Sequence, residues 1–299
     1  MDAENSRSVP FDGAPEVGII IALKEEFREL HSQLDSPFPV EDRETRAIDY
    51  LFVRDCGSRM YRCAATFVGE MGPTEAALAT ERFIGRRNPK TIVMLGIAAG
   101  IHADVRLGDV ILAKRVGRYL DRARVTDGDE TFDIEPGGDS FPCSSDLVKA
   151  CQNFEFAHAD RFQRWVQDGK AVLAETVPDN SLSKLIEKNW LDVNPGFHEG
   201  PIASGPIVAA SEEFLGWVKS QNRQYLGLEM EGGAMLAAVY SRSDPKRTMM
   251  LRGVSDFGDK RKRQLDKIGK GGLRRYAMQN AIRMLWSLMD CSVFPVNPT

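Results

Sequence analysis

Several features are scarce in this chain of 299 residues. The five cysteines are spread along it without a C-x-x-C pair, which predicts neither a disulfide framework nor a zinc site. Free thiols are typical of a reducing compartment, so we expect a cytoplasmic protein. No apolar run is long enough to cross a bilayer, and residues 1–15 are polar, without a signal-peptide core. We therefore expect a flexible leader at 1–15 and no membrane association.

Histidine is also scarce, and basic residues do not outnumber acidic ones. The four histidines show no metal-ligand spacing and belong to no nucleophile motif. The sequence therefore predicts no metal site, and it implies no organic cofactor. The net charge of -4 lacks the basic excess of proteins that bind duplex nucleic acid, so we expect no nucleic-acid partner.

The chain does contain enough apolar residues for a large core. Hydrophobic residues make up 42% and charged residues 27% of it, which is typical of a globular protein. From Val17 onward, short apolar runs alternate with helical patterns, which predicts an α/β fold with a mixed or mostly parallel sheet covered by helices on both faces. We expect one continuous domain at 16–299.

The predicted elements are the following. Strands are expected at 17–23, 50–53, 61–68, 91–95, 109–113, 201–210, 225–229 and 248–254, with 50–53 and 61–68 pairing as a hairpin around Gly57 and Ser58. Helices are expected from Lys24, and at 73–84, 234–239 and 274–289. The segment from about 115 to 200 is interpreted as an insertion, because glycine, proline and charge interrupt the strand rhythm and only 145–154 and 181–190 have helical patterns.

The most informative motif is 227–234 (GLEMEGGA), which places Glu229 and Glu231 where an apolar strand meets a helix rich in small residues. Side chains two apart on a strand point to one face, so both carboxylates are candidates for one cleft. An ionised carboxylate accepts hydrogen bonds from neighbouring hydroxyls, which suits a ribose 2′,3′-diol. The alternative is that Glu231 only interacts with the positive end of the following helix.

Two further acidic sites follow predicted strands. Glu25 and Glu26 come after the first strand, and Ser255 and Asp256 come after the strand at 248–254. Open α/β sheets place their ligands at the carboxyl ends of strands. Each site alone also fits an ordinary helix-start carboxylate. Their joint placement favours a common ligand site.

With these motifs, the chain resembles the purine nucleoside phosphorylase and methylthioadenosine/S-adenosylhomocysteine nucleosidase superfamily. The resemblance runs from about Val17 to Met289, without much of the insertion. It is carried by 18–26 (GIIIALKEE), 96–100 (GIAAG) with 108–110 (GDV), 202–205 (IASG), 229–231 (EME) and 252–256 (RGVSD). It implies a three-layer α/β/α fold with a central mixed, partly barrel-like sheet, an adenine nucleoside or nucleotide as the small-molecule partner, and a homodimer or higher homo-oligomer.

The resemblance also implies roles for individual residues. Glu26 matches the carboxylate that activates the attacking water, and Glu231 matches the ribose-diol acceptor with Met230 beside the sugar. Asp256, oriented by Ser255, matches the acid that protonates or hydrogen-bonds purine N7. The remaining residues implied to contact substrate are Ile97, Glu229, Val208 and Ala209, the last two through backbone contacts to the base.

The chemistry of ribosyl transfer is consistent with these roles. Breaking the bond passes through an oxocarbenium-like state, so the enzyme must neutralise the departing base, hold the sugar and present a nucleophile on the opposite face. Asp256, Glu231 and Glu26 provide one function each. As an acid near neutral pH, Asp256 must hold a proton, which burial among Val254, Phe257 and the sheet favours.

Water is the expected nucleophile. A phosphorolytic enzyme needs arginines and backbone donors around a phosphate. The resembled phosphorylases carry an arginine in the first glycine-rich turn and another just before the second, but 22–26 (ALKEE) and 94–97 (MLGI) contain none. A phosphorylase whose phosphate site comes from the insertion remains an alternative.

Basic residues distinguish this chain from compact nucleosidases. Arg118 and Arg122 lie in a segment that aligns loosely with the sugar 5′ side, and 260–263 (KRKR) follows Asp256. Guanidinium groups suit phosphate oxygens, so a 5′-phosphorylated adenine nucleotide, ATP or AMP, is the favoured substrate. A solvated charged face is the alternative. The chain also resembles bacterial antiviral effectors that deplete adenine nucleotides. Two further alternatives are a methylthioadenosine/S-adenosylhomocysteine nucleosidase and a non-catalytic nucleotide sensor.

Overall fold

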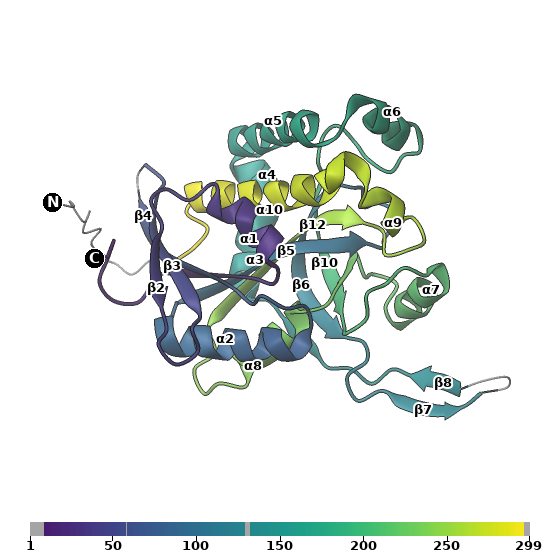
Figure 1. Ribbon diagram of the computed structural model, residues 1–299, viewed down its shortest axis with the longest axis horizontal. Helices are drawn as coiled ribbons and strands as arrows, with labels where there is room; N and C mark the ends of the chain where they lie inside the picture. Colours follow the sequence, from purple (N-terminus) through teal and green to yellow (C-terminus); the bar gives the residue numbers. More distant parts are fainter. Residues whose placement is uncertain (1–8, 58, 129–131, 296–299) are drawn as a thin grey trace.

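The centre of the protein is a mixed sheet of ten strands (Figure 1). The computed structural model describes residues 9–57, 59–128 and 132–295. The sheet strands are β1 (Val17–Ile21), β2 (Phe38–Glu41), β3 (Ile48–Asp55), β4 (Met60–Phe67), β5 (Thr91–Gly100), β6 (Val110–Arg118), β9 (Ser140–Pro142), β10 (Phe197–Ser204), β11 (Gly227–Glu229) and β12 (Arg247–Asp256). Their order is β11-β10-β6-β12-β5-β1-β4-β3-β2, with β9 beside β6.

One part of this sheet closes on itself. Strand β11 pairs in parallel with β10 and also antiparallel with β5, where Leu228 lies opposite Ala99. The strands β5, β12, β6, β10 and β11 therefore form a ring, while β1, β4, β3 and β2 extend from it as an open sheet. The expected mixed and partly barrel-like sheet is confirmed.

Helices cover both faces of the sheet. They are α1 (Lys24–His31), α2 (Pro73–Arg87), α3 (Ser145–Gln152), α4 (Phe154–Ala157), α5 (Ala159–Thr176), α6 (Asp179–Glu187), α7 (Glu212–Gln221), α8 (Gly232–Tyr240), α9 (Lys262–Leu265), a 3₁₀ turn at Ile268–Lys270, and α10 (Gly272–Asp290). Helix α10 packs on β12 and β5 and contacts α1 and α5, whereas α2 and α8 pack together on the other face (Figure 1). This arrangement gives the expected three layers.

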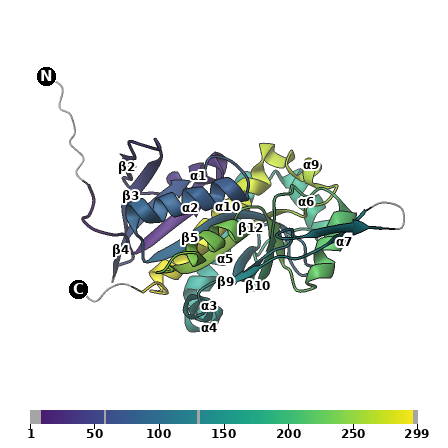
Figure 2. The ribbon, with the colours of Figure 1, turned by 90° about the horizontal axis from the view of Figure 1, so that it is seen from below.

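A two-stranded hairpin stands apart from these layers. Strands β7 (Arg124–Asp127) and β8 (Phe132–Glu135) pair with each other in a separate sheet. Both ribbon views show the hairpin extending from the body of the molecule (Figures 1 and 2). At its base, Trp217 of α7 donates a hydrogen bond from Nε1 to the Ile134 carbonyl oxygen.

The segment at 115–200 is more ordered than we predicted. Helix α5, of 18 residues, was missed, although its buried positions, among them Trp165, Val172 and Leu173, repeat at helical spacing. The polar run around Gly169 disguised this pattern. Gly169 faces Pro195 and Asn280, and Trp165 belongs to the same core cluster as the central strands. That this segment is an insertion relative to the family remains a prediction.

Strand β5 is longer than predicted. We expected it to end at Leu95 and enter a glycine-rich turn, but it continues through Gly100 and pairs with β12 along its length. A Cβ atom at Gly96 would overlap the Arg252 guanidinium. Gly96 therefore leaves room for the Arg252 side chain to cross the strand, and the strand does not end there.

The expected flexible leader at 1–15 stays a prediction. Residues 1–8 lie outside the described part of the chain, as does Ser58 of the expected turn between β3 and β4. Contacts with the domain begin at Phe11. Phe11 packs against the core, and the Asp12 carbonyl oxygen accepts a hydrogen bond from Arg62 at 3.2 Å.

Candidate active site

The carboxyl ends of several strands meet at a cleft of about 500 Å³. Helix α1 begins just after β1 and brings Glu26 to it, β12 ends there with Asp256, and the junction of β11 and α8 brings Glu231. Nine predicted site residues line this cleft together: Glu26, Ile97, Val208, Ala209, Glu229, Met230, Glu231, Ser255 and Asp256. The expected gathering of the three acidic sites is therefore observed.

Glu229 and Glu231 have different surroundings. The Glu229 carboxylate accepts hydrogen bonds from the backbone N–H groups of Glu231 at 3.1 Å and Gly232 at 2.8 Å, and from Arg252 Nη2 at 2.6 Å. Its oxygens thus hold the start of α8 and one buried guanidinium. The geometry gives Glu229 a positioning role in the cleft wall.

Glu231 is the carboxylate that remains available to a ligand. It is the N-cap residue of α8 but makes no side-chain capping bond, because Glu229 and Ser204 accept the hydrogen bonds of the first N–H groups. Among the described residues, its Oε1 accepts one hydrogen bond, a 3.3 Å contact from the Gly72 N–H. Burial, followed by the nearby Glu229 charge, raises the pKa of Glu231. Glu231 does lie at the positive end of α8, so the alternative that it only interacts with this helix end stays open.

The different surroundings of Glu229 and Glu231 predict different effects of replacing them. The change Glu229→Gln removes the charge that Arg252 faces, so we expect the free energy of unfolding to fall by about 2 kcal/mol, the range for hydrogen bonds to charged groups. Urea unfolding at pH 7 measures it. In substrate kinetics, kcat should fall with little change in KM, whereas Glu231→Gln should raise KM. A matching rise in KM for both variants would indicate that Glu229 also contacts the sugar.

Arg252 is the buried cation of the site. Its side chain is 2% exposed and crosses β5 over Gly96, where Glu26 also lies: a Cβ atom at Gly96 would be 3.0 Å from Glu26 Oε2. Arg252 therefore lies among Glu26, Glu229 and Glu231. If all three acidic side chains were ionised, their charge would exceed that of the one guanidinium, so this part of the cleft opposes their full ionisation.

That environment acts on Glu26. Burial raises the pKa of Glu26 from 4.5 to about 8, with Arg252 opposing the shift and the Glu231 charge adding to it. A carboxylate with a pKa near the working pH is suited to accept a proton from an attacking water.

Asp256 is held by three donors. Its carboxylate accepts hydrogen bonds from Ser255 Oγ at 3.0 Å, the Gly258 N–H at 2.8 Å and Lys262 Nζ at 2.6 Å. Asp256 is 2% exposed, as the apolar surroundings predicted, but the ammonium group of Lys262 was not expected there. Lys262 provides both a counter-charge and an exchangeable proton beside Asp256.

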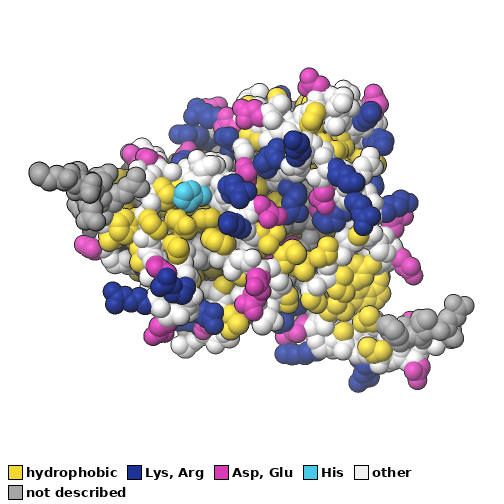
Figure 3. All heavy atoms as spheres, in the orientation of Figure 1, with side chains coloured by type: hydrophobic (Ala, Val, Ile, Leu, Met, Phe, Trp, Pro, Cys, Tyr) yellow, Lys and Arg dark blue, Asp and Glu magenta, His cyan; other side chains and the backbone are white. Residues whose placement is uncertain are grey.

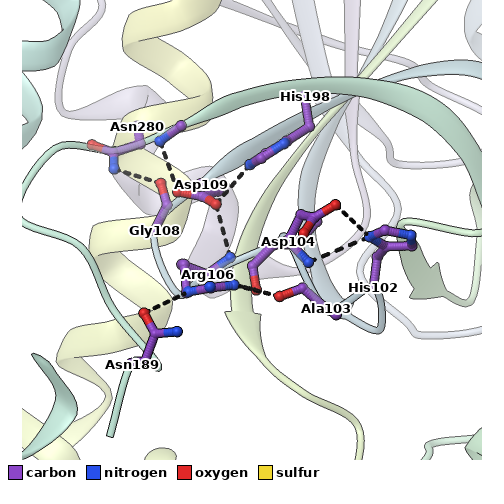
Figure 4. A network of polar contacts seen from close by, with 11 residues as sticks. His102, Ala103, Asp104, Arg106, Gly108, Asp109, Asn189, His198 and Asn280 are labelled. Atoms are coloured by element: carbon purple, nitrogen blue, oxygen red, sulfur yellow. Dashed lines mark hydrogen bonds and ion pairs between the residues drawn. The ribbon is translucent and has the colours of Figure 1, made fainter. Parts of the chain in front are cut away.

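A polar network near the carboxyl end of β12 fixes the loop from β5 to β6 (Figure 4). The buried Asp109 carboxylate accepts hydrogen bonds from the Arg106 and Gly196 N–H groups and contacts His198 Nε2 at 2.7 Å. Asn280 of α10 donates a hydrogen bond to the Gly108 carbonyl oxygen at 2.7 Å. Asp109 O also accepts from the Val254 N–H, so the network supports the end of β12.

Two predicted site residues lie elsewhere. Arg118 forms an ion pair with Asp121 at 2.9 Å and lines a smaller cavity of about 130 Å³ beside the start of α8. Arg122 is 74% exposed and forms an ion pair with Asp139 at 3.1 Å. The expected placement of both arginines in the site is thus not observed within this chain, because the turn after β6 directs them towards Asp121 and Asp139.

Other cations line the cleft and were missed. Arg252 belongs to the motif 252–256 that carried the resemblance, but no individual role was predicted for it. Lys262 belongs to the basic run 260–263, in which no single residue was assigned a role. Arg274, at the start of α10, forms an ion pair with Glu25 at 2.8 Å. No local pattern singles out Arg274, because it reaches the cleft only through the packing of α10 against α1.

Within the described residues, no group of three metal-binding side chains is placed to hold an ion. The same part of the chain contains no helix with the length and apolar character that a bilayer requires.

Comparison with known proteins adds the family. The sequence profile of the phosphorylase superfamily matches residues 16–288. A 5′-methylthioadenosine/S-adenosylhomocysteine nucleosidase of Maridesulfovibrio salexigens is 21% identical over 279 residues, covering 91% of this chain and 98% of that protein. The ATP nucleosidase Cap17 of Escherichia coli is 28% identical over 193 residues, or 64% of this chain. The match spans 35% of the length of Cap17.

Solved structures share the fold. The nucleosidase of Neisseria meningitidis, crystallised with methylthio-immucillin-A, superimposes with a TM-score of 0.64. The match covers 92% of this chain and 98% of that one at 17% sequence identity, so it supports the architecture alone.

Proposed function

The chain belongs to the phosphorylase superfamily, and we propose that it hydrolyses the N-glycosidic bond of an adenine nucleotide and releases adenine. The observation that carries this proposal is the convergence of Glu26, Glu231 and Asp256 on one cleft. Glu26 and Glu231 both lie at helix starts, but that position does not explain why they face the same cleft as Asp256, which ends β12. The cleft volume also suits a ligand of nucleoside size.

The residues divide the reaction between them. Glu231 accepts hydrogen bonds from the ribose hydroxyls and orients the sugar. Glu26 takes a proton from water as the water oxygen bonds to C1′. The C1′–N9 bond breaks, and its electron pair passes to the purine. Asp256 delivers a proton to N7, and Lys262 then supplies Asp256 with a new proton. The products are adenine and a ribosyl compound with a hydroxyl at C1′.

Charge favours water over phosphate as the nucleophile. A phosphate group near Glu26 would also face Glu229 and Glu231, and the Arg252 guanidinium already forms an ion pair with Glu229. Like charges at such range raise the energy of a bound anion. A neutral water has no such penalty, which supports hydrolysis over the phosphorylase alternative.

The 5′ substituent is the finer part of the proposal. Lys262 and Arg274 are 21% and 26% exposed at the cleft. The Arg274 partner, Glu25, is 57% exposed, and such surface pairs contribute about 0–1 kcal/mol, so a 5′-phosphate can displace it. The relation to an ATP nucleosidase also favours ATP or AMP.

A second candidate is a methylthioadenosine/S-adenosylhomocysteine nucleosidase. Two observations favour it: the relative with this activity aligns over 98% of its length, and six carboxylates but only three cations line the cleft. An acidic cleft suits a substrate without a phosphate.

A substrate panel distinguishes these functions. We expect purified protein in phosphate-free buffer to release adenine from ATP or AMP, measured by chromatography beside adenosine, methylthioadenosine and S-adenosylhomocysteine. Release only from the thio-nucleosides would establish the second candidate. Release that requires added phosphate would identify a phosphorylase, and binding of ATP without turnover would identify a sensor.

Assembly and biological context remain proposals. The homodimer or higher homo-oligomer implied by the resemblance is tested by light scattering after size-exclusion chromatography, where a mass near 33.3 kDa would contradict it. The cytoplasmic location and the antiviral role are tested by cell fractionation and by survival of phage-infected cells carrying Glu26→Gln.

A further inference from the structure

A second cavity, of about 640 Å³, lies on the other side of α1 from the cleft. Helix α1 presents Lys24, Phe27, Arg28 and His31 to this cavity, at the i, i+3, i+4, i+7 spacing of one helix face. The neighbouring positions 25 and 26 line the catalytic cleft instead. One helix thus separates two cavities, and the second has no part in the reaction proposed above.

The inner part of this cavity is aromatic. The ring of Phe27 lies 5.1 Å from that of Tyr50 and 5.0 Å from that of Phe67, measured between centroids. The His31 ring meets the Tyr50 ring edge-on at 5.1 Å. The four side chains belong to α1, β3 and β4 and together form an aromatic wall of the cavity.

The outer part is strongly basic. Five cationic side chains line the cavity with one carboxylate, Glu75: Lys24, Arg28, Arg46, Arg82 and Arg86. Lys24, Arg28 and Arg82 are exposed and make no ion pair with any described residue. This balance is opposite to that of the cleft and to the net charge of the chain.

Arg86, unlike the three exposed cations, has a carboxylate partner. Arg86 and Arg87 share a single carboxylate, that of the buried Asp49, at 2.8 Å each. Of the two, only Arg86 lines the cavity, where Asp42 also contributes negative charge near it. On this side of the molecule Figure 3 shows exposed apolar side chains beside a histidine, with lysine and arginine side chains around them.

We propose that this cavity is a second, non-catalytic binding site for a nucleotide, with the base against the aromatic residues and the phosphate held by Arg28, Arg82 and Lys24. Arginine forks match phosphate oxygens, and aromatic rings stack on bases. The volume lies in the range of small-ligand sites. Since a phosphate would meet mostly cations here and mostly carboxylates in the cleft, the two sites should differ in salt dependence.

Calorimetric titration with AMP tests the proposal on the Glu26→Gln variant, which cannot consume the probe. We expect two binding events per chain, one of which weakens strongly as salt rises. Adding Arg28→Ala and Arg82→Ala should remove that event and leave the other. The matched control is Arg43→Ala, an exposed arginine of the β2–β3 turn outside the cavity lining, which should keep both events.

The outcomes separate this site from the proposed function. Because the inference does not need the cleft to be a nucleosidase, the salt-sensitive event should persist when Glu231→Ala removes binding in the cleft. In the otherwise native chain, the Arg28→Ala/Arg82→Ala double variant should have an unchanged melting temperature. Its rate of base release should stay within about twofold of the native rate. A single AMP event that survives loss of both arginines would overturn the second site.

Discussion

Glu26→Gln is expected to reduce the rate of base release by at least about a thousandfold, within the range for loss of a general base. The amide keeps the size of the side chain but cannot take a proton from water. Release of adenine at saturating substrate measures the effect. Glu29→Gln is the matched control, because Glu29 lies on the same helix, outside the cleft lining, and contacts Gln279. A Glu26→Gln enzyme with normal turnover would remove Glu26 from the mechanism.

The pH profile of the native enzyme should report the same group. The base must be ionised to act, and the pKa of Glu26 is raised to about 8. We therefore expect kcat/KM to rise with pH below about 8 and to level off above it. A profile that is flat from pH 6 to 9 would show that another group takes the proton.

Glu26→Gln should at the same time stabilise the fold at neutral pH. In the native chain the pKa of Glu26 is about 8, above its ordinary value of 4.5, so between these values the unfolded state is ionised while the folded state keeps its proton. The native protein then loses stability as pH rises through this window. At pH 7 the variant should be more stable by up to about 3 kcal/mol, and the difference should vanish below about pH 4.5. Urea unfolding at both pH values measures it.

Asp256→Asn is the second large expected effect, a loss of at least about a hundredfold in turnover of the natural substrate. The amide retains an acceptor for the Gly258 N–H, but it cannot deliver the proton that the departing purine needs. Chromatographic rates for native and variant protein measure the loss. Unchanged rates would contradict the assignment of Asp256 as the acid.

A substrate that leaves without protonation provides the control for Asp256. The 4-nitrophenolate group of 4-nitrophenyl β-ribofuranoside departs as a stable anion, so Asp256→Asn should retain most of the native rate with it. Glu26→Gln should lose its activity with both substrates, because water attack is still required. Equal losses with both substrates for Asp256→Asn would indicate a role in holding the sugar or the local structure.

The sequence by itself determined the fold class and the gathering of the three acidic sites. Alternating strands and helices predict an α/β sheet, and the carboxyl ends of parallel strands meet at one edge, so Glu26, Glu231 and Asp256 could be placed together before any coordinates. Helix α5 carried an equally readable repeat around Trp165 and was missed only because polar residues around Gly169 interrupted it.

Tertiary structure decided how the residues of the site work. Their spacing in the sequence does not distinguish Glu229 from Glu231. In the structure Glu229 accepts hydrogen bonds from the N–H groups at the start of α8, and Glu231 is left available to a ligand. Arg252 acquires its role from Glu229 on β11, and Lys262, at the start of α9, from Asp256 at the end of β12. Arg118 instead forms an ion pair with Asp121. The second cavity likewise exists only where α1, β3, β4 and α2 meet. Periodicity reports the local backbone, whereas the direction of a charged side chain depends on which distant elements pack around it.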